Sequence, residues 1–444
     1  MKKIIETVKN IWRIEDLKSR ILITLLFVTI YRFGSQIVLP GVDANALTEM
    51  QNQTKDGLMS LLDMFSGGAF SNASIFALGI MPYISASIVI QLLAVAVPYF
   101  QKMQREGESG RRKINQYTRM LTIAILVFQA PAYLVNLHNT SGGALTYGFN
   151  SWFIISSTII LAAGSMFILW LGERITDKGV GNGVSLIIMI GIIARLPESI
   201  GQEFVTALSA SEGGGLVKFL IEIVALLFVM ALAIILVKAT RKVPVQYAKR
   251  VEGGKQFGGA RQYIPLKLFA ANVMPIIFAQ AIMFIPMVIA SSSGAEGGIW
   301  MSFRDHTSIV YNIVLVTLII AFTYFYTAIT LNPVQMAEDM KRNNGFIPGV
   351  KPGKATADYL DNVMSHLLLP GSLFIALIAI MPAFASIFGI SQGFAQFFGG
   401  TSLLILVGVV LDTLQQINSH LLVRRYDGLL NAGHVRTRSN VNAY

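Results

Sequence analysis

The sequence predicts an all-α membrane protein that crosses the bilayer ten times. Of its 444 residues, 54% are hydrophobic and only 13% are charged, roughly half the charged fraction of a typical soluble protein. Ten apolar stretches are about as long as the roughly 20 residues that a helix needs to span the hydrocarbon core. Lys and Arg gather in every second connection between these stretches, as expected for cytoplasmic loops. The composition therefore excludes a disordered chain and argues against a soluble enzyme.

The ten stretches follow one another along the whole chain. The first, 21–39, could be mistaken for a signal peptide, but the apolar run is longer than usual and acidic residues precede it. The fifth is interrupted by Gly191, Arg195 and Pro197. The predicted spans are residues 21–39, 75–97, 120–137, 152–171, 184–200, 217–237, 266–290, 309–331, 367–388 and 397–417.

The basic residues orient these spans. Ten spans place both termini on one side, and the segments of that side hold 30 Lys and Arg against four in the other set, with Arg32 inside the first span. The positive-inside rule therefore predicts that both termini are cytoplasmic. The formal charge is +16 on the cytoplasmic segments and −6 on the outer ones. A positive inner face of this strength predicts contact with anionic phospholipids.

The outer connection 40–74 contains an apolar segment that is too short to span the membrane. Residues 58–65 could form a short helix, and Ser66, Gly67 and Gly68 follow it. One interpretation is a movable element inside a vestibule, because short helices at membrane depth must be packed in protein. The other is an interfacial helix that lies on the outer leaflet.

The second span combines small residues with large aliphatic ones. Pro82 removes a backbone hydrogen bond and predicts a bend. Ile80, Ile84 and Ile88 recur at intervals of four, so they share one helix face. That face could pack against lipid or protein, or it could form an apolar constriction that excludes ions.

The residue types that perform chemistry are scarce. The few ionisable residues in or beside the spans, Arg32, Glu222, Asp412 and His366, are expected to snorkel or to cap helices rather than to carry protons. The chain has no cysteine, and the basic turn 349–355 lacks the spacing and hydroxyl residue of a phosphate loop. The sequence thus predicts no catalytic, cofactor or metal site. A secondary transporter of a small molecule and an intramembrane enzyme remain as alternatives to a passive channel.

The connection after the sixth span pairs eight basic residues with one acidic residue, Glu252. Four glycines, Gly253, Gly254, Gly258 and Gly259, lie at its tip. A flexible, projecting basic loop suits an acidic surface, which could be RNA phosphate or an acidic protein.

Five long blocks of the chain together resemble the SecY/Sec61-alpha family, the channel-forming subunits of the Sec protein translocon. These blocks are residues 66–93, 106–119, 172–188, 346–356 and 398–407. The resemblance implies the SecY fold, in which two inverted five-helix halves close around an hourglass pore. The halves would be residues 21–200 and 217–417, with an outer hinge loop at 201–216 and a plug at about 58–72. The cytoplasmic parts would be residues 1–20, the loops 238–265 and 332–366, and the tail 418–444.

The resemblance also implies four groups of site residues. The pore ring would be Ile80, Ile84, Val184, Ile188, Ile277 and Ile405, with Val184 smaller than the isoleucine common there. The plug would include Leu58, Leu61, Leu62, Met64, Phe65, Gly67 and Gly68. The lateral gate would include Ser85, Ile88, Gln129 and Phe269, where many bacterial relatives have Asn in place of this phenylalanine. Partner docking would use Arg241, Lys242, Lys249, Arg250, Lys255, Arg261, Lys351 and Lys354, and Lys351 stands where the family has arginine.

The mechanism implied by the resemblance is passive conduction of polypeptides. Unfolded preproteins would cross the plasma membrane through the ring, and signal sequences or transmembrane segments would leave sideways into lipid. Since the chain has no nucleotide site, the SecA ATPase or the ribosome would supply the driving force. The resemblance further implies the subunits SecE and SecG, and cooperation with YidC and with SecD/SecF.

Overall fold

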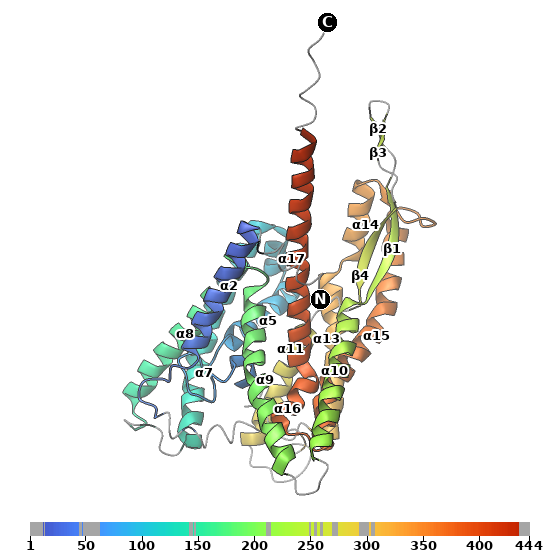
Figure 1. Ribbon diagram of the computed structural model, residues 1–444. Helices are drawn as coiled ribbons and strands as arrows, with labels where there is room; N and C mark the ends of the chain where they lie inside the picture. Colours follow the sequence, from blue (N-terminus) through green and yellow to red (C-terminus); the bar gives the residue numbers. More distant parts are fainter. Residues whose placement is uncertain are drawn as a thin grey trace.

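A computed structural model of the chain describes residues 12, 14–43, 47, 63–141, 145, 148–209, 215–247, 250–252, 255–257, 261–268, 274–292, 302 and 307–434. Each of the ten predicted spans overlaps a helix (Figure 1). These helices are α2 (Glu15–Gly34), α5 (Met81–Ala96), α7 (Glu108–Ser141), α8 (Ser151–Lys178), α9 (Gly183–Ser209), α10 (Gly215–Lys238), α11 (Met274–Ser292), α13 (Ile309–Thr330), α15 (Lys354–Ile387) and α17 (Gly400–His434).

Most of these helices could cross a membrane by length and composition. Within the described residues, seven are long and apolar enough on their own, and an eighth span results if α5 and the short helix α6 (Pro98–Arg105) count as one bent span. The remaining two predicted spans correspond to α2, which carries charged residues at both ends, and to α11. The chain is therefore a multi-pass membrane protein.

The sequence predicted that the second span bends at Pro82, but the bend lies elsewhere. Helix α5 begins at Met81, so Pro82 lies in the first turn, where its missing N–H costs no helical hydrogen bond. Residues 75–80, predicted as part of the span, form turns. The bend lies instead at Val97, whose extended backbone separates α5 from α6 at an angle of 101°. Pro98 then begins α6, so a proline lies in the first turn of both helices.

Several helices continue beyond the predicted spans. Helix α9 reaches Ser209, so much of the predicted outer loop 201–216 is helical. Helix α15 begins at Lys354, inside the predicted cytoplasmic loop 332–366, which also holds α14 (Pro333–Arg342). Helix α17 runs to His434, so most of the predicted tail is helix that projects from the bundle (Figure 1).

The basic connection after α10, which the sequence predicted as a flexible projecting loop, is a β-hairpin over most of its described length. Strand β1 (Thr240–Tyr247) pairs antiparallel with β4 (Arg261–Lys267), and β2 (Arg250–Glu252) pairs with β3 (Lys255–Phe257). Val243 and Val245 are buried from one face of β1, against a small core that includes Met340 and Leu360. The glycines predicted at its tip lie outside the described residues.

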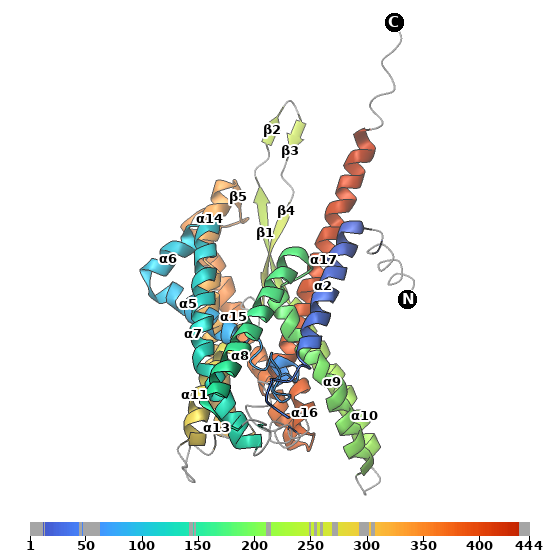
Figure 2. The same cartoon turned by 90° about the vertical axis from the view of Figure 1, so that its left-hand side faces the viewer.

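The two halves of the chain have separate helix packing. In the first half α5 packs on α7, α7 on α8, and α8 on α9, while in the second half α11 packs on α13 and α13 on α15. The halves meet mainly where α9 packs against α10, α17 and the short helix α16 (Gln392–Ala395). Figure 2 shows α9 beside α10 at this junction.

Candidate functional site

Five of the six residues predicted for the pore ring belong to one apolar cluster. Ile80 precedes α5 and Ile84 lies in its first turn, Val184 and Ile188 lie in the first turns of α9, and Ile405 lies near the start of α17. We call the whole apolar cluster that contains these five residues the constriction cluster. Ile80, Ile188 and Ile405 are buried, whereas Ile84 and Val184 are half-buried.

The sixth residue, Ile277, is not a member of that cluster. It lies on α11 and is half-buried, while its neighbours Ile276 and Ala279 pack in the core of the second half. The structure therefore brings together ring residues from three helices and leaves the α11 residue apart from them.

The plug residues that the structure describes lie deep inside the molecule. Residues 63–71 are all buried, and we call them the plug segment. Met64 and Phe65 belong to the constriction cluster. A helix on the outer leaflet would expose one face to lipid headgroups, so this burial favours the vestibule interpretation. Leu58, Leu61 and Leu62 lie outside the described residues.

Glycines set how closely the plug segment approaches α9. Gly67 and Gly68 have φ of +64° and +90°, a left-handed conformation that favours glycine. A Cβ atom on Gly67 would lie 2.7 Å from the Cα atom of Gly191, and one on Gly191 would lie 2.9 Å from the Phe65 carbonyl oxygen. Gly191, which interrupts the fifth predicted span, is therefore a contact surface for the plug segment.

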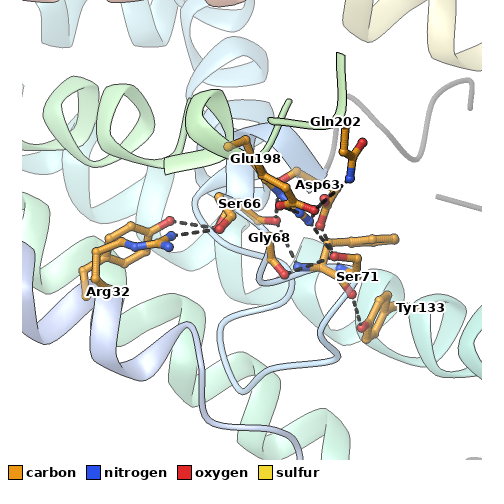
Figure 3. A network of polar contacts seen from close by, with 12 residues as sticks. Arg32, Asp63, Ser66, Gly68, Ser71, Tyr133, Glu198 and Gln202 are labelled. Carbon is orange, nitrogen blue, oxygen red and sulfur yellow. Dashed lines mark hydrogen bonds and ion pairs between the residues drawn. The ribbon is translucent and has the colours of Figure 1, made fainter. Parts of the chain in front are cut away.

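A polar network joins the plug segment to α9 (Figure 3). Arg195 Nη2 donates to the Asp63 carboxylate and, at 2.7 Å, to Ser71 Oγ. Asp63 Oδ1 also accepts from the Ser71 backbone N–H at 2.8 Å, and Arg195 Nη1 donates to Glu198 Oε2 at 2.7 Å. Burial raises the pKa of the Asp63 carboxyl above its ordinary value, while Arg195 and Ser71 act in the opposite direction by stabilising its ionised form.

Two other helices bind the backbone of the plug segment. From α2, Arg32 Nη1 donates to the Gly67 carbonyl at 2.8 Å and Tyr31 Oη donates to the Ser66 carbonyl at 3.1 Å. From α7, Tyr133 Oη donates to the Phe70 carbonyl at 2.9 Å. Arg32 thus points inward, contrary to the prediction that it snorkels to the membrane surface. Sequence reasoning also missed Arg195, for which an arginine inside an apolar stretch was the one available signal.

The predicted gate residues lie on neighbouring helices of the first half. Ser85 and Ile88 are on α5, half-buried and buried respectively, and Gln129 is exposed on α7, which packs on α5. Phe269 lies outside the described residues, so its position relative to these three stays untested.

The predicted docking residues belong to two connections that share one sheet. Strand β5 (Gly345–Phe346) pairs with β1, which gives the strand order β4-β1-β5. Arg241 and Lys242 are exposed on β1, and Lys351 and Lys354 are exposed after β5. Arg250, Lys255 and Arg261 lie on strands of the hairpin, and Lys249 lies outside the described residues. The sheet therefore presents both basic connections as one structural unit.

Comparisons with a family model and with individual proteins identify the same family. The family model described as SecY matches residues 74–414. The protein translocase subunit SecY of Streptomyces galbus is 40% identical over 436 residues, which cover 94% of this chain and 98% of that protein.

Two solved structures share the fold. One is a SecY protein whose plug domain is described as stabilising the closed state of the translocation channel and maintaining a membrane seal; it aligns with a TM-score of 0.59 and 18% identity. The other is Sec61 in the canine ribosome-channel complex from the endoplasmic reticulum, with a TM-score of 0.61 and 18% identity. In each case the alignment covers 90% of this chain and 92% of the other.

Proposed function

Because the chain belongs to the SecY family, we propose that it is the protein-conducting channel subunit of the Sec translocase. It passes unfolded preproteins across the plasma membrane and releases transmembrane segments sideways into lipid. The observation that carries this function is the constriction cluster, in which apolar residues from α5, α9 and α17 pack together with the buried Met64 and Phe65.

An apolar constriction suits a cargo of variable sequence. Aliphatic side chains make no specific hydrogen bonds, so they can close around any extended chain, and they exclude hydrated ions when the chain is absent. Ile277 would complete the ring from α11 when the halves move. The plug segment fills the outer side of the constriction in the resting channel.

The lateral gate lies between two helix pairs, α5 with α7 and α11 with α13. Each pair packs within its own half, whereas the halves meet mainly through α9. A hinge at that junction would let the opposite side open toward lipid. An apolar segment in the pore would then gain favourable transfer energy by moving into the bilayer.

The basic sheet serves partner docking on the cytoplasmic side. The ribosome is supported as a partner by the ribosome-bound relative, and its RNA phosphates suit the exposed Arg241, Lys242, Lys351 and Lys354. The SecA ATPase uses the same surface. SecE and SecG complete the complex, and YidC and SecD/SecF cooperate with it. The protein lies in the inner plasma membrane among anionic phospholipids, with both termini cytoplasmic.

Photocrosslinking tests the channel function directly. A photoreactive residue at position 84 or 277 of the reconstituted complex should capture a preprotein that is stalled during SecA-driven, ATP-dependent uptake. A photoreactive residue at lipid-exposed Leu220 on α10 serves as the matched control, because it lies away from the pore. Uptake of a preprotein without capture at either ring position would rule out this pore. A complete complex that takes up no preprotein would overturn the channel function.

A further inference from the structure

The polar network around Asp63 differs from the other contacts of the plug segment. Among the described residues, α2 and α7 hold the segment through its backbone carbonyls, at Ser66, Gly67 and Phe70. In the described part of the chain, the hydrogen bonds from other elements to its side chains come from Arg195 on α9 alone, which binds Asp63 and Ser71. These contacts therefore depend on which residues the plug segment carries.

Arg195 links two parts of the plug segment to each other and also links the segment to α9. Its guanidinium bridges Asp63 and Ser71, which lie on either side of the Gly67–Gly68 turn, and the Gly68 N–H donates to the Asp63 carbonyl at 2.9 Å. A Cβ atom on Gly68 would approach the Arg195 guanidinium carbon at 3.1 Å. The arginine thus packs against the turn that it holds.

The two charged partners of Arg195 differ in burial. The Asp63 side chain is 12% exposed, whereas that of Glu198 is 53% exposed and lies three residues along the same helix. If the plug segment leaves, Asp63 reaches water and Arg195 keeps Glu198. When the plug segment moves away from α9, no charged side chain is therefore left buried without a partner. The contact between Arg195 and Asp63 can thus break and form again.

We propose that Arg195 is a positioning residue that latches the plug segment to α9 through Asp63 and so sets the closed state of the channel. The latch rests on the proposed channel function and adds to it the specific contact that must break before a preprotein can pass. Removing Arg195 alone leaves the Asp63 carboxylate buried without its cation, which is strongly unfavourable. Removing both charges leaves neither a carboxylate nor a guanidinium without its partner.

The test compares Arg195→Gln, Asp63→Asn and the double variant in the complete complex reconstituted in planar bilayers. Resting ion conductance without preprotein should rise roughly tenfold or more for Arg195→Gln, because breaking one partner of a buried pair is costly. The double variant should leak less than Arg195→Gln, since no carboxylate is left buried without its cation, but more than the wild type, since the latch itself is gone. Arg119→Gln, which breaks the exposed 2.6 Å pair with Glu173 on α7 and α8, should leave conductance unchanged.

A pH profile separates the latch from a general structural defect. In Arg195→Gln the buried Asp63 loses its cation, and neither Tyr133 on α7 nor Glu198, the other carboxylate bound by Arg195, supplies a positive charge in its place, so the carboxyl pKa of Asp63 rises. The closed state keeps a protonated Asp63 at low pH and loses stability as pH rises through that pKa, so the leak should grow with pH. The double variant should show no such growth.

The outcomes distinguish the latch from the channel function. Wild-type complex that fails to take up preprotein would overturn the channel function itself. Wild-type complex that transports preprotein, with Arg195→Gln as tight as the wild type at every pH, would overturn the latch alone. A double variant whose rise in leak equals the product of the rises in the two single variants would also overturn it, because effects that add in free energy mean that the two side chains act independently.

Discussion

At the scale of single residues, the contact between Gly67 and Gly191 sets how closely the plug segment approaches α9. Helix α9 would gain about 1 kcal/mol from alanine in place of an interior glycine. A methyl group on Gly191 would nevertheless lie 2.9 Å from the Phe65 carbonyl oxygen and 3.2 Å from the Gly67 nitrogen. Stability of the helix and closure of the plug therefore have opposite requirements at this position.

We expect Gly191→Ala to raise resting ion conductance several-fold without lowering the thermal stability of the complex. The methyl group would push the plug segment outward while α9 itself becomes more helical. Gly201→Ala is the matched control, because Gly201 lies on the same helix and a Cβ atom there meets nothing within 4 Å. Unchanged conductance with a lower Tm would contradict the prediction, since it would mean that the methyl group disturbs packing and leaves the seal intact.

At the scale of elements, the β-hairpin after α10 converts a basic connection into a rigid support. Seven residue pairs join β1 to β4, and β5 from the connection after α13 adds a third strand. Val243 and Val245 anchor this sheet in its own apolar core, so the exposed Arg241 and Lys242 stand on a fixed surface. Fixed charges bind a partner with less loss of conformational entropy than charges on a mobile loop.

Reversing one charge in each connection should weaken docking. We expect Lys242→Glu together with Lys351→Glu to lower the affinity for the ribosome or for SecA roughly tenfold at low salt, with a smaller effect at high salt because exposed charges are screened. The control is Arg112→Glu together with Lys178→Glu, at exposed positions of α7 and α8, which changes the net charge by the same amount as the double variant. An equal loss for both would indicate that net charge alone governs binding.

The elements differ in how far the sequence could predict them. The approximate positions of the spans were predictable, because an apolar run of about 20 residues has few other places to lie. Within the described residues, seven helices, or eight with the bent pair, qualify as spans by length and composition. The start of α5 at Met81 was not, since Pro82 is compatible with both a bend and a first turn. The contact between Asp63 and Arg195 joins residues 132 positions apart, and nothing in a single sequence specifies which distant charges meet. The ring residues came from a family resemblance, whereas Arg195 had no such guide.

At the scale of the whole molecule, charge and architecture divide along the same axis. The start of α2, the hairpin and the end of α17 all lie at one end of the bundle (Figure 1). The segments assigned to this end carry a formal charge of +16, and those of the other end carry −6. A membrane with anionic lipids on its inner leaflet favours one orientation of such a molecule.

The absence of cysteine in the 444 residues allows this orientation to be measured without altering the background. Single variants Ser419→Cys on α17 and Lys242→Cys on β1 should resist a membrane-impermeant thiol reagent applied to intact cells, and should react after the inner membrane is opened. Ser209→Cys, at the exposed outer end of α9, should react in intact cells. All three positions are exposed to solvent and differ in the predicted side of the membrane. Labelling in intact cells is divided by labelling after the membrane is opened, which corrects for differences in intrinsic reactivity between the cysteines. Labelling of position 419 or 242 in intact cells would reverse the orientation, and with it the placement of the docking surface.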